Sequence, residues 1–173
     1  MLVDTHAHLY WDSYQQDLEQ VLDRAKQNNV GLIINIGTDL ETSELAVKLQ
    51  SLKVKMYATI GIHPHDGGEI NSSEIPDLIV QLEKLYHANS EKVVAIGECG
   101  LDFSQSTNSN QLEIYKAQAQ LAKKLNLPLI IHCRDAWDQI FIPELQGTSG
   151  VFHTFSGTAK DAKKALELGY YLS

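Results

Sequence analysis

Short apolar runs alternate with amphipathic helical segments along the whole chain. Most of the runs are near-continuous in Val, Ile and Leu, a composition typical of parallel strands that are buried on both faces. We therefore predict seven strands, at residues 1–6, 30–37, 56–63, 93–98, 129–133, 150–155 and 169–172.

The segments between these runs carry apolar residues at helical spacing. In the first of them, Leu18, Val21, Leu22 and Ala25 fall on one face of a helix. The same reasoning predicts helices at residues 17–28, 40–52, 73–86, 111–125, 135–145 and 158–168. The fifth is short, and Pro143 disturbs it because proline cannot donate a helical hydrogen bond.

Strict alternation of strands and helices predicts an α/β fold with a parallel sheet. The doubly wound open sheet and the (β/α)8 barrel both fit this alternation. No glycine-rich phosphate-binding turn follows the first run, which weakens the dinucleotide-binding form of the open sheet. Polar residues at the carboxyl ends of several runs favour a TIM-type barrel, because barrel enzymes take their catalytic groups from these ends. We expect residues 1–173 to form one domain.

Composition and charge narrow the class of protein. The formal net charge of -8 argues against a broad basic nucleic-acid surface and against attraction to membranes. It leaves room for a small site that handles phosphates through metal ions. No stretch approaches the ~20 apolar residues of a membrane span, and the start does not resemble a signal peptide. Cys99 and Cys133 fit no zinc-finger spacing and no disulfide framework, so we expect a reduced, cytoplasmic setting.

Histidines gather at the ends of the predicted strands. Six of the seven histidines lie there, and only His87 falls in a helix. His6 and His8 end the first run two residues apart, so they point to the same side of an extended strand. Glu98 ends the fourth run. The other histidines at strand ends are His63, His65, His132 and His153.

These side chains suit a divalent metal centre. Imidazole nitrogens with one carboxylate are ligands for Zn, Mn, Fe or Ni, and the two oxygens of Glu98 are enough to bridge two metals. We predict one metal on His6, His8 and Glu98, and a second on Glu98, His132 and His153. Two metals ~3.5–4 Å apart can activate a water and stabilise a phosphoryl or carbonyl oxygen.

Other residues near the strand ends are candidates for substrate contacts. We assign His63 a catalytic or substrate-binding role, either at the substrate or behind a metal ligand. His65 is a substrate-binding candidate that could instead face water. Arg134, followed by Asp135, could hold a phosphate or orient a histidine, and a salt bridge at a helix start is the structural alternative.

Two further pairs flank the candidate ligands. Tyr10 and Trp11 follow the first histidine pair and could form part of a wall on which a base stacks, or simply pack the loop. Cys99 and Cys133 adjoin candidate ligands, and we expect them to be small packing residues.

Five sequence blocks resemble the signatures of TatD-type metal-dependent deoxyribonucleases, which belong to the metallo-dependent hydrolase superfamily. The blocks are Val3-Asp4-Thr5-His6-Ala7-His8, Gly61-Ile62-His63-Pro64-His65, Gly97-Glu98-Cys99-Gly100-Leu101-Asp102, Ile131-His132-Cys133-Arg134-Asp135-Ala136 and His153-Thr154-Phe155-Ser156-Gly157. The resemblance runs from residue 3 to the last residue.

The resemblance implies a TIM-type barrel, a divalent metal centre and hydrolysis of DNA phosphodiesters. It implies a 3′–5′ exonuclease acting on single-stranded DNA, with Mg²⁺ supporting activity. It places ligand roles on His6, His8, Glu98, His132 and His153, and a phosphate contact on His63. A histidine-rich site prefers softer metals than Mg²⁺, so Zn²⁺, Mn²⁺ or Ni²⁺ could occupy it in a crystal.

The sequence departs from the family pattern by stopping early. Family members continue past Ser173 into a further helix and an eighth strand that ends in a metal-binding aspartate. We therefore expect an incomplete barrel of about six and a half units with an open edge at the first strand. A truncated chain, completion by another chain and an inactive remnant are the three explanations, and truncation is the one we favour. A barrel hydrolase of another ester or amide is the alternative function.

Overall fold

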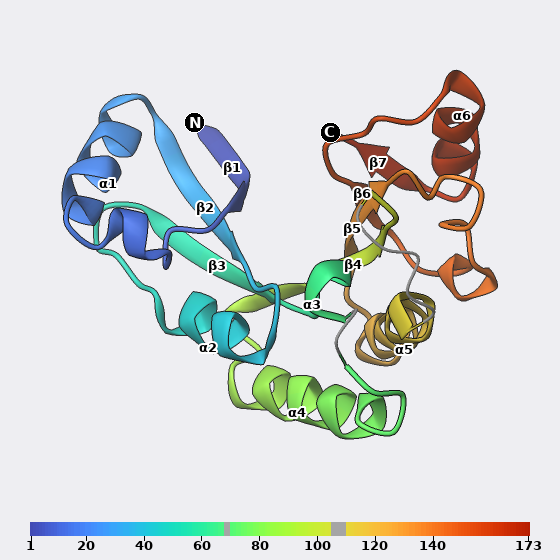
Figure 1. Ribbon diagram of the computed structural model, residues 1–173. Helices are drawn as coiled ribbons and strands as arrows, with labels where there is room; N and C mark the ends of the chain where they lie inside the picture. The colour runs from blue at the N-terminus through green and yellow to red at the C-terminus, as the bar shows by residue number, and fades with distance from the viewer. Residues whose placement is uncertain (68–69, 105–109) are drawn as a thin grey trace.

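A computed structural model of the chain describes residues 1–67, 70–104 and 110–173. Its frame is one sheet of seven parallel strands that lie side by side in sequence order (Figure 1). The strands are β1 (Leu2–Ala7), β2 (Val30–Ile36), β3 (Lys55–Ile60), β4 (Val93–Asp102), β5 (Leu129–Arg134), β6 (Gly150–Phe152) and β7 (Tyr170–Leu172).

Helices cover the outer side of the curled sheet (Figure 1). They are α1 (Leu18–Gln27), α2 (Leu40–Lys48), α3 (Pro64–Gly67), α4 (Ile75–Ala88), α5 (Asn110–Leu125) and α6 (Ala159–Glu167), with 3-10 turns η1 (Asp12–Tyr14) and η2 (Pro143–Leu145). Capping boxes fix the starts of α2 and α6, through Asp39 and Thr158. Within the described ranges, no helix has the length and apolarity needed to cross a membrane.

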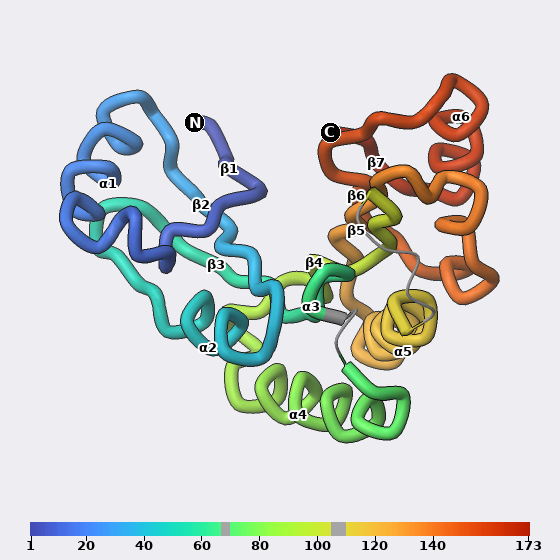
Figure 2. Tube along the Cα trace, in the orientation of Figure 1, coloured from blue at the N-terminus to red at the C-terminus, as the bar shows by residue number. Residues whose placement is uncertain are grey.

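The sheet curls into part of a barrel, with β1 and β7 as its two edges. The two chain ends lie at opposite ends of this arc (Figure 2). The largest buried cluster joins the sheet to α4 and α5 and includes Leu82, Tyr115 and Leu129, all fully buried. The incomplete TIM-type barrel predicted from the sequence is confirmed. The edges expose apolar side chains, such as Leu2 and Tyr171.

Close contact between β4 and β5 depends on glycine at position 100. Gly100 has a φ of +136°, and a Cβ built on it would lie 2.0 Å from the carbonyl oxygen of His132. Only glycine combines this backbone conformation with such an approach. The register Gly100 opposite His132 brings the carboxyl end of β4 against that of β5.

The structure corrects several predicted boundaries. The helix predicted at 135–145 is wrong: Asp135 takes a left-handed φ of 54°, a single turn follows Ala136, and the 3-10 turn η2 starts at Pro143. Proline removes the backbone donor that a continuing helix needs. Strand β4 extends to Asp102, four residues beyond its predicted end at Glu98.

Candidate metal centre

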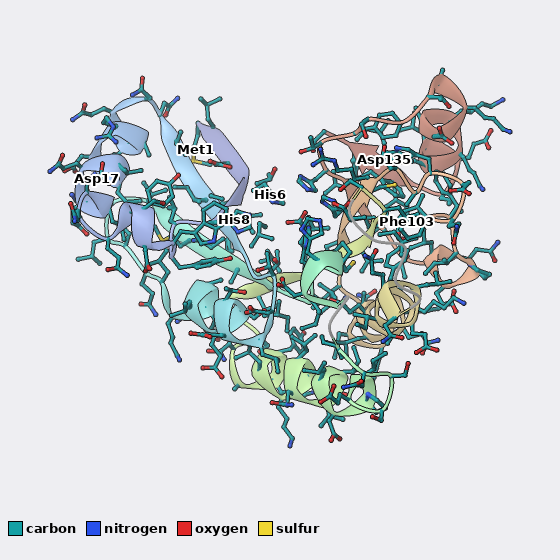
Figure 3. All side chains as sticks on the ribbon, viewed as in Figure 1. Met1, His6, His8, Asp17, Phe103 and Asp135 are labelled. Atoms are coloured by element: carbon teal, nitrogen blue, oxygen red, sulfur yellow. The ribbon has the colours of Figure 1, made fainter. Side chains whose placement is uncertain are left out.

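The candidate ligands meet on the inner side of the curled sheet, at the carboxyl ends of its strands. His6 lies in β1, Glu98 in β4 and His132 in β5. His153 directly follows β6, and His63 lies three residues beyond the end of β3. Figure 3 shows His6 and His8 projecting from the first strand toward the hollow of the arc. Parallel strands bring these residues together because their carboxyl ends share one rim.

Glu98 lies at the centre of this group and is only 4% exposed. Its Oε1 accepts hydrogen bonds from His132 Nδ1 at 3.0 Å and from His153 Nε2 at 2.7 Å. Its Oε2 lies 3.3 Å from His6 Nε2, and His63 Nε2 lies 3.6 Å from Oε1. Burial alone would raise the pKa of Glu98, but the hydrogen bonds from His132, His153 and His6 outweigh it and hold the pKa below its usual value. The carboxylate is therefore ionised.

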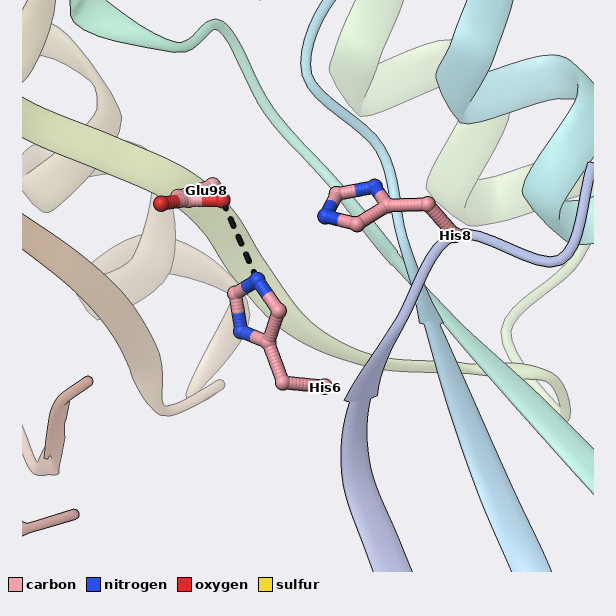
Figure 4. A group of neighbouring side chains, drawn as sticks. All are labelled: His6, His8 and Glu98. Atoms are coloured by element: carbon pink, nitrogen blue, oxygen red, sulfur yellow. Dashed lines mark ion pairs between the residues drawn. The ribbon is translucent and has the colours of Figure 1, made fainter. Parts of the chain in front are cut away.

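Two groups of potential ligands share this carboxylate. One comprises His6, His8 and Glu98, drawn in Figure 4, and the other comprises His63, Glu98 and His132. In each group the potential ligand atoms lie within 4.8 Å of one another. The first group coincides with the ligand set predicted for one metal. The second contains His63 where the sequence analysis placed His153.

Asp102 is a site residue that the sequence analysis did not select. Its side chain is almost fully buried, and its Oδ2 accepts a hydrogen bond from His132 Nε2 at 2.9 Å. His65 Nε2 lies 2.9 Å from the same oxygen. Ser104 binds the other oxygen through its amide and hydroxyl groups. Burial would raise the pKa of Asp102, but the hydrogen bonds from Ser104 and His132 lower it to about 2. The sequence analysis ended this strand at Glu98. Recognition that β4 continues to Asp102 would have placed both carboxylates on one strand.

Hydrogen bonds on their outer nitrogens orient several imidazoles. His132 turns Nε2 to Asp102 and Nδ1 to Glu98. His8 Nδ1 lies 3.0 Å from the hydroxyl oxygen of Tyr10, and this hydroxyl donates to the carbonyl of Ile36 at 2.7 Å. Tyr10 is therefore an acceptor for His8, which leaves the other nitrogen of His8 for a ligand. This is the outer arrangement that metal-binding histidines show in proteins.

His153 is held by an unusual backbone at the next residue. Thr154 has a φ of 49°, a left-handed conformation that β-branched residues rarely adopt. Its hydroxyl lies 3.0 Å from His153 Nδ1, while Nε2 of His153 faces Glu98. Strain of this kind persists only where the surrounding structure imposes it, and it is common at functional sites.

In His63, the ring nitrogen turned away from Glu98 accepts a hydrogen bond, whereas that of His132 donates one. His63 Nδ1 accepts a hydrogen bond from the backbone amide of His65 at 3.1 Å. Burial lowers the pKa of His63 to about 4, so the ring is neutral at pH 7 and carries its proton on Nε2. A protonated Nε2 donates hydrogen bonds and cannot bind a metal. His63 is thereby suited to contact a substrate oxygen.

The remaining candidates surround this group. Arg134 is exposed and lines a cavity of about 300 Å³ together with His132, His153, Thr154 and Ser156. His65 is exposed and is held by Asp102. Asp135 is exposed as well.

Tyr10, Trp11 and the cysteines also have defined places. Trp11 stacks on His8 with ring centroids 4.5 Å apart. Cys99 and Cys133 are buried, and burial raises the pKa of both thiols. They are thus packed and protonated, in line with the role expected for them.

The donor set supports the fit of a metal to these residues. His6 turns Nε2 toward Glu98, so this nitrogen and the shared carboxylate lie where one ion would contact both. The donor set of imidazoles and one shared carboxylate fits Zn²⁺ or Mn²⁺ better than Mg²⁺. The identity of the metal remains a prediction.

A family profile and curated relatives match this chain over nearly its whole length. The family profile described as "TatD related DNase" matches residues 3–173. The "Uncharacterized metal-dependent hydrolase YabD" of Bacillus subtilis is 40% identical, over 100% of this chain and 68% of its own length. The "3'-5' ssDNA/RNA exonuclease TatD" of Salmonella typhimurium is 32% identical, over 99% of this chain and 66% of its own length.

A solved structure has the same fold. The crystal structure of YJJV, a TatD homologue from Escherichia coli, superposes with a TM-score of 0.86 at 30% identity. The match covers 99% of this chain and 66% of that one. The chain thus spans about two thirds of the length of these relatives.

Proposed function

The chain belongs to the TatD-related DNase family of metal-dependent hydrolases, and from this premise we propose that it is a two-metal phosphodiesterase acting on single-stranded DNA. Its relatives named as 3′–5′ exonucleases for single-stranded DNA and RNA support the substrate class and direction. RNA is a second substrate of the same chemistry. A cytoplasmic location stays a prediction.

The sharing of Glu98 between two ligand groups carries this proposal. A single buried carboxylate lies within 4.8 Å of His6 and His8 on one side, and of His63 and His132 on the other. Each carboxylate oxygen faces a different group: Oε2 faces His6, and Oε1 faces His132. This is the placement expected of a carboxylate that bridges two ions.

The hydrogen bonds on the ring nitrogens that point away from Glu98 suggest which residues hold each ion. We assign one position to His6, His8 and Glu98, and the other to Glu98, His132 and His153. Nδ1 of His63 accepts from the His65 amide, so the proton of that neutral ring stays on Nε2, which donates. His132 and His153 can instead keep their proton on the nitrogen bonded to Asp102 or Thr154 and turn the other nitrogen to the ion. Divalent ions held here supply Lewis acidity and lower the pKa of a bound water.

The chain's own residues then bind and orient the phosphodiester. His63 donates from Nε2 to a non-bridging phosphate oxygen, and its neutral ring does not compete with Glu98 for protons. Arg134, at the exposed side of the cavity, attracts the next phosphate along the strand. His65 stands beside Asp102 at the same rim and contributes a further polar contact. Glu98 and Asp102 keep the surrounding imidazoles in fixed orientations.

The test compares the complete protein with two variants that each lose one carboxylate. Glu98→Gln keeps the size of the side chain and removes the shared charge. Glu44→Gln is the matched control, because Glu44 pairs with Lys48 on the exposed face of α2, away from the strand ends. We expect metal-dependent release of nucleotides from single-stranded DNA by wild type and Glu44→Gln, and background release by Glu98→Gln.

Three results would overturn the proposal. Equal turnover by Glu98→Gln would refute the bridging role. Hydrolysis of simple esters with no cleavage of DNA or RNA would indicate a different barrel hydrolase. Bound metal without cleavage of any of these substrates would indicate a metal-binding remnant.

A further inference from the structure

Trp11 presents an open aromatic face beside the candidate metal centre. One face of its indole lies on the His8 imidazole, with centroids 4.5 Å apart and planes only 7° from parallel. The residue is nevertheless 52% exposed. Half exposure with one face covered means that the opposite face is open to solvent. Exposure of such a large apolar surface has a cost that a ligand would remove.

Hydrogen bonds hold the backbone that carries this ring, and the stack on His8 sets the orientation of the indole. The Trp11 amide donates to the carbonyl of His8 at 3.1 Å, and the Trp11 carbonyl accepts from the amide of Tyr14 at 2.9 Å. Trp11 thereby caps the 3-10 turn η1. A rigid aromatic loses little conformational entropy when a second ring stacks on it.

One imidazole, that of His8, separates the indole from the metal position assigned to His6, His8 and Glu98. His8, which covers the inner face of Trp11, belongs to the ligand group of His6 and Glu98. A nucleotide whose phosphate contacts that group extends its sugar and base away from it. The base of that nucleotide, or of its neighbour, can then reach the outer face of Trp11.

The charge of the chain gives stacking a particular importance. With a formal net charge of -8, the chain offers little general attraction for a phosphate backbone. Affinity must therefore come from the metal ions and from contacts to the bases. Stacking on an aromatic ring suits a nuclease without sequence preference, since every base has a π-face.

We propose that Trp11 binds a nucleobase of the substrate strand by stacking it on the indole face opposite His8. This inference rests on the proposed function and specifies how that site holds its substrate. It makes Trp11 a substrate-binding residue. An indole that only packed against His8 would not distinguish an oligonucleotide with bases from one without.

The experiment compares cleavage of two single-stranded DNA substrates by the complete, metal-loaded protein. One substrate carries normal bases, and the other has abasic residues near the cleaved end. We expect Trp11→Ala to reduce the preference for the base-bearing substrate roughly 5- to 150-fold, and Trp11→Phe to retain most of it. The control is Leu52→Ala. Leu52 is an exposed apolar residue just before β3, at the amino ends of the strands and away from the metal centre. An unchanged preference in Trp11→Ala would overturn the inference.

A binding measurement decides the question independently of catalysis. The chain has two tryptophans, so Trp137→Phe leaves Trp11 as the single indole. We expect a phosphorothioate oligonucleotide, which resists cleavage, to quench its fluorescence, and the abasic analogue to quench it less. Absence of quenching would overturn the inference even if DNA is cleaved. Quenching without any cleavage would uphold it while refuting the proposed nuclease activity.

Discussion

Replacing Asp102 by asparagine tests the outer hydrogen bonds of the candidate metal centre. The two carboxylate oxygens of Asp102 accept hydrogen bonds from the amide and hydroxyl of Ser104 and from His132 Nε2, and His65 Nε2 lies 2.9 Å from Oδ2. An asparagine side chain has only one accepting oxygen. If that oxygen stays with Ser104, the amide NH₂ meets the N–H groups of both imidazoles. At least one charge-assisted hydrogen bond is then lost.

The magnitude follows from the geometry around His132. A charge-assisted hydrogen bond contributes about 1.5–3 kcal/mol, equivalent to a roughly 10- to 150-fold change in an equilibrium constant. In addition, the substitution removes the charge that keeps a proton on His132 Nε2, so the single proton of a neutral ring then favours Nδ1, the nitrogen that faces Glu98. That tautomer blocks the nitrogen we assign to the metal. We therefore expect Asp102→Asn to weaken metal binding at the Glu98–His132–His153 position by about 10- to 100-fold. Loss of a carboxylate that orients a metal-binding histidine generally has an effect of this size.

Competitive titration with a chelating dye measures this effect for Zn²⁺ or Mn²⁺. Asp23→Asn is the matched control, since Asp23 pairs with Lys53 at an exposed position away from the strand ends. Near-ultraviolet circular dichroism verifies that each variant is folded. A folded Asp102→Asn protein that binds both ions with wild-type affinity would refute the role assigned to Asp102.

Three further predictions follow from the same contacts. Tyr10→Phe removes the acceptor for His8 Nδ1, so the chelator titration should show about 10-fold weaker metal binding at the His6–His8 position alone. Weaker metal binding at both positions would contradict this role of Tyr10. His63→Gln should lower kcat on DNA while elemental analysis finds an unchanged metal content; loss of metal would make His63 a ligand. Gly100→Ala should reduce the free energy of unfolding, measured by urea titration, by about 2–5 kcal/mol, because a Cβ would clash with the His132 carbonyl. An unchanged urea midpoint would contradict the tight approach of β4 and β5.

The sequence predicts the barrel and most of the strand ends because the apolar runs are long and the polar residues follow them directly. Burial on both faces makes most of β2 and the first half of β5 apolar, and this pattern is visible without any knowledge of tertiary contacts. His6 and His8 are predicted to point the same way from strand periodicity alone. The structure brings both into one group with Glu98.

Other features depend on contacts that the linear pattern does not contain. Asp102 enters the site because β4 continues beyond Glu98 and pairs with β5 up to Arg134. The segment after Arg134 has helical spacing, yet Trp137 packs among aromatic rings of β6 and its following loop instead. The donor and acceptor nitrogens of His63 are set by the local chain path, which places the amide of His65 against its ring.

The number of metal ions bound per chain distinguishes a shared carboxylate from two independent sites. Inductively coupled plasma mass spectrometry, after dialysis against Zn²⁺ or Mn²⁺ and removal of free ion, counts the ions held per chain. The account predicts two ions per wild-type chain and per Glu44→Gln chain, and loss of both from folded Glu98→Gln, because one carboxylate serves both positions. Wild-type protein without bound metal, or Glu98→Gln protein that retains two ions, would contradict it.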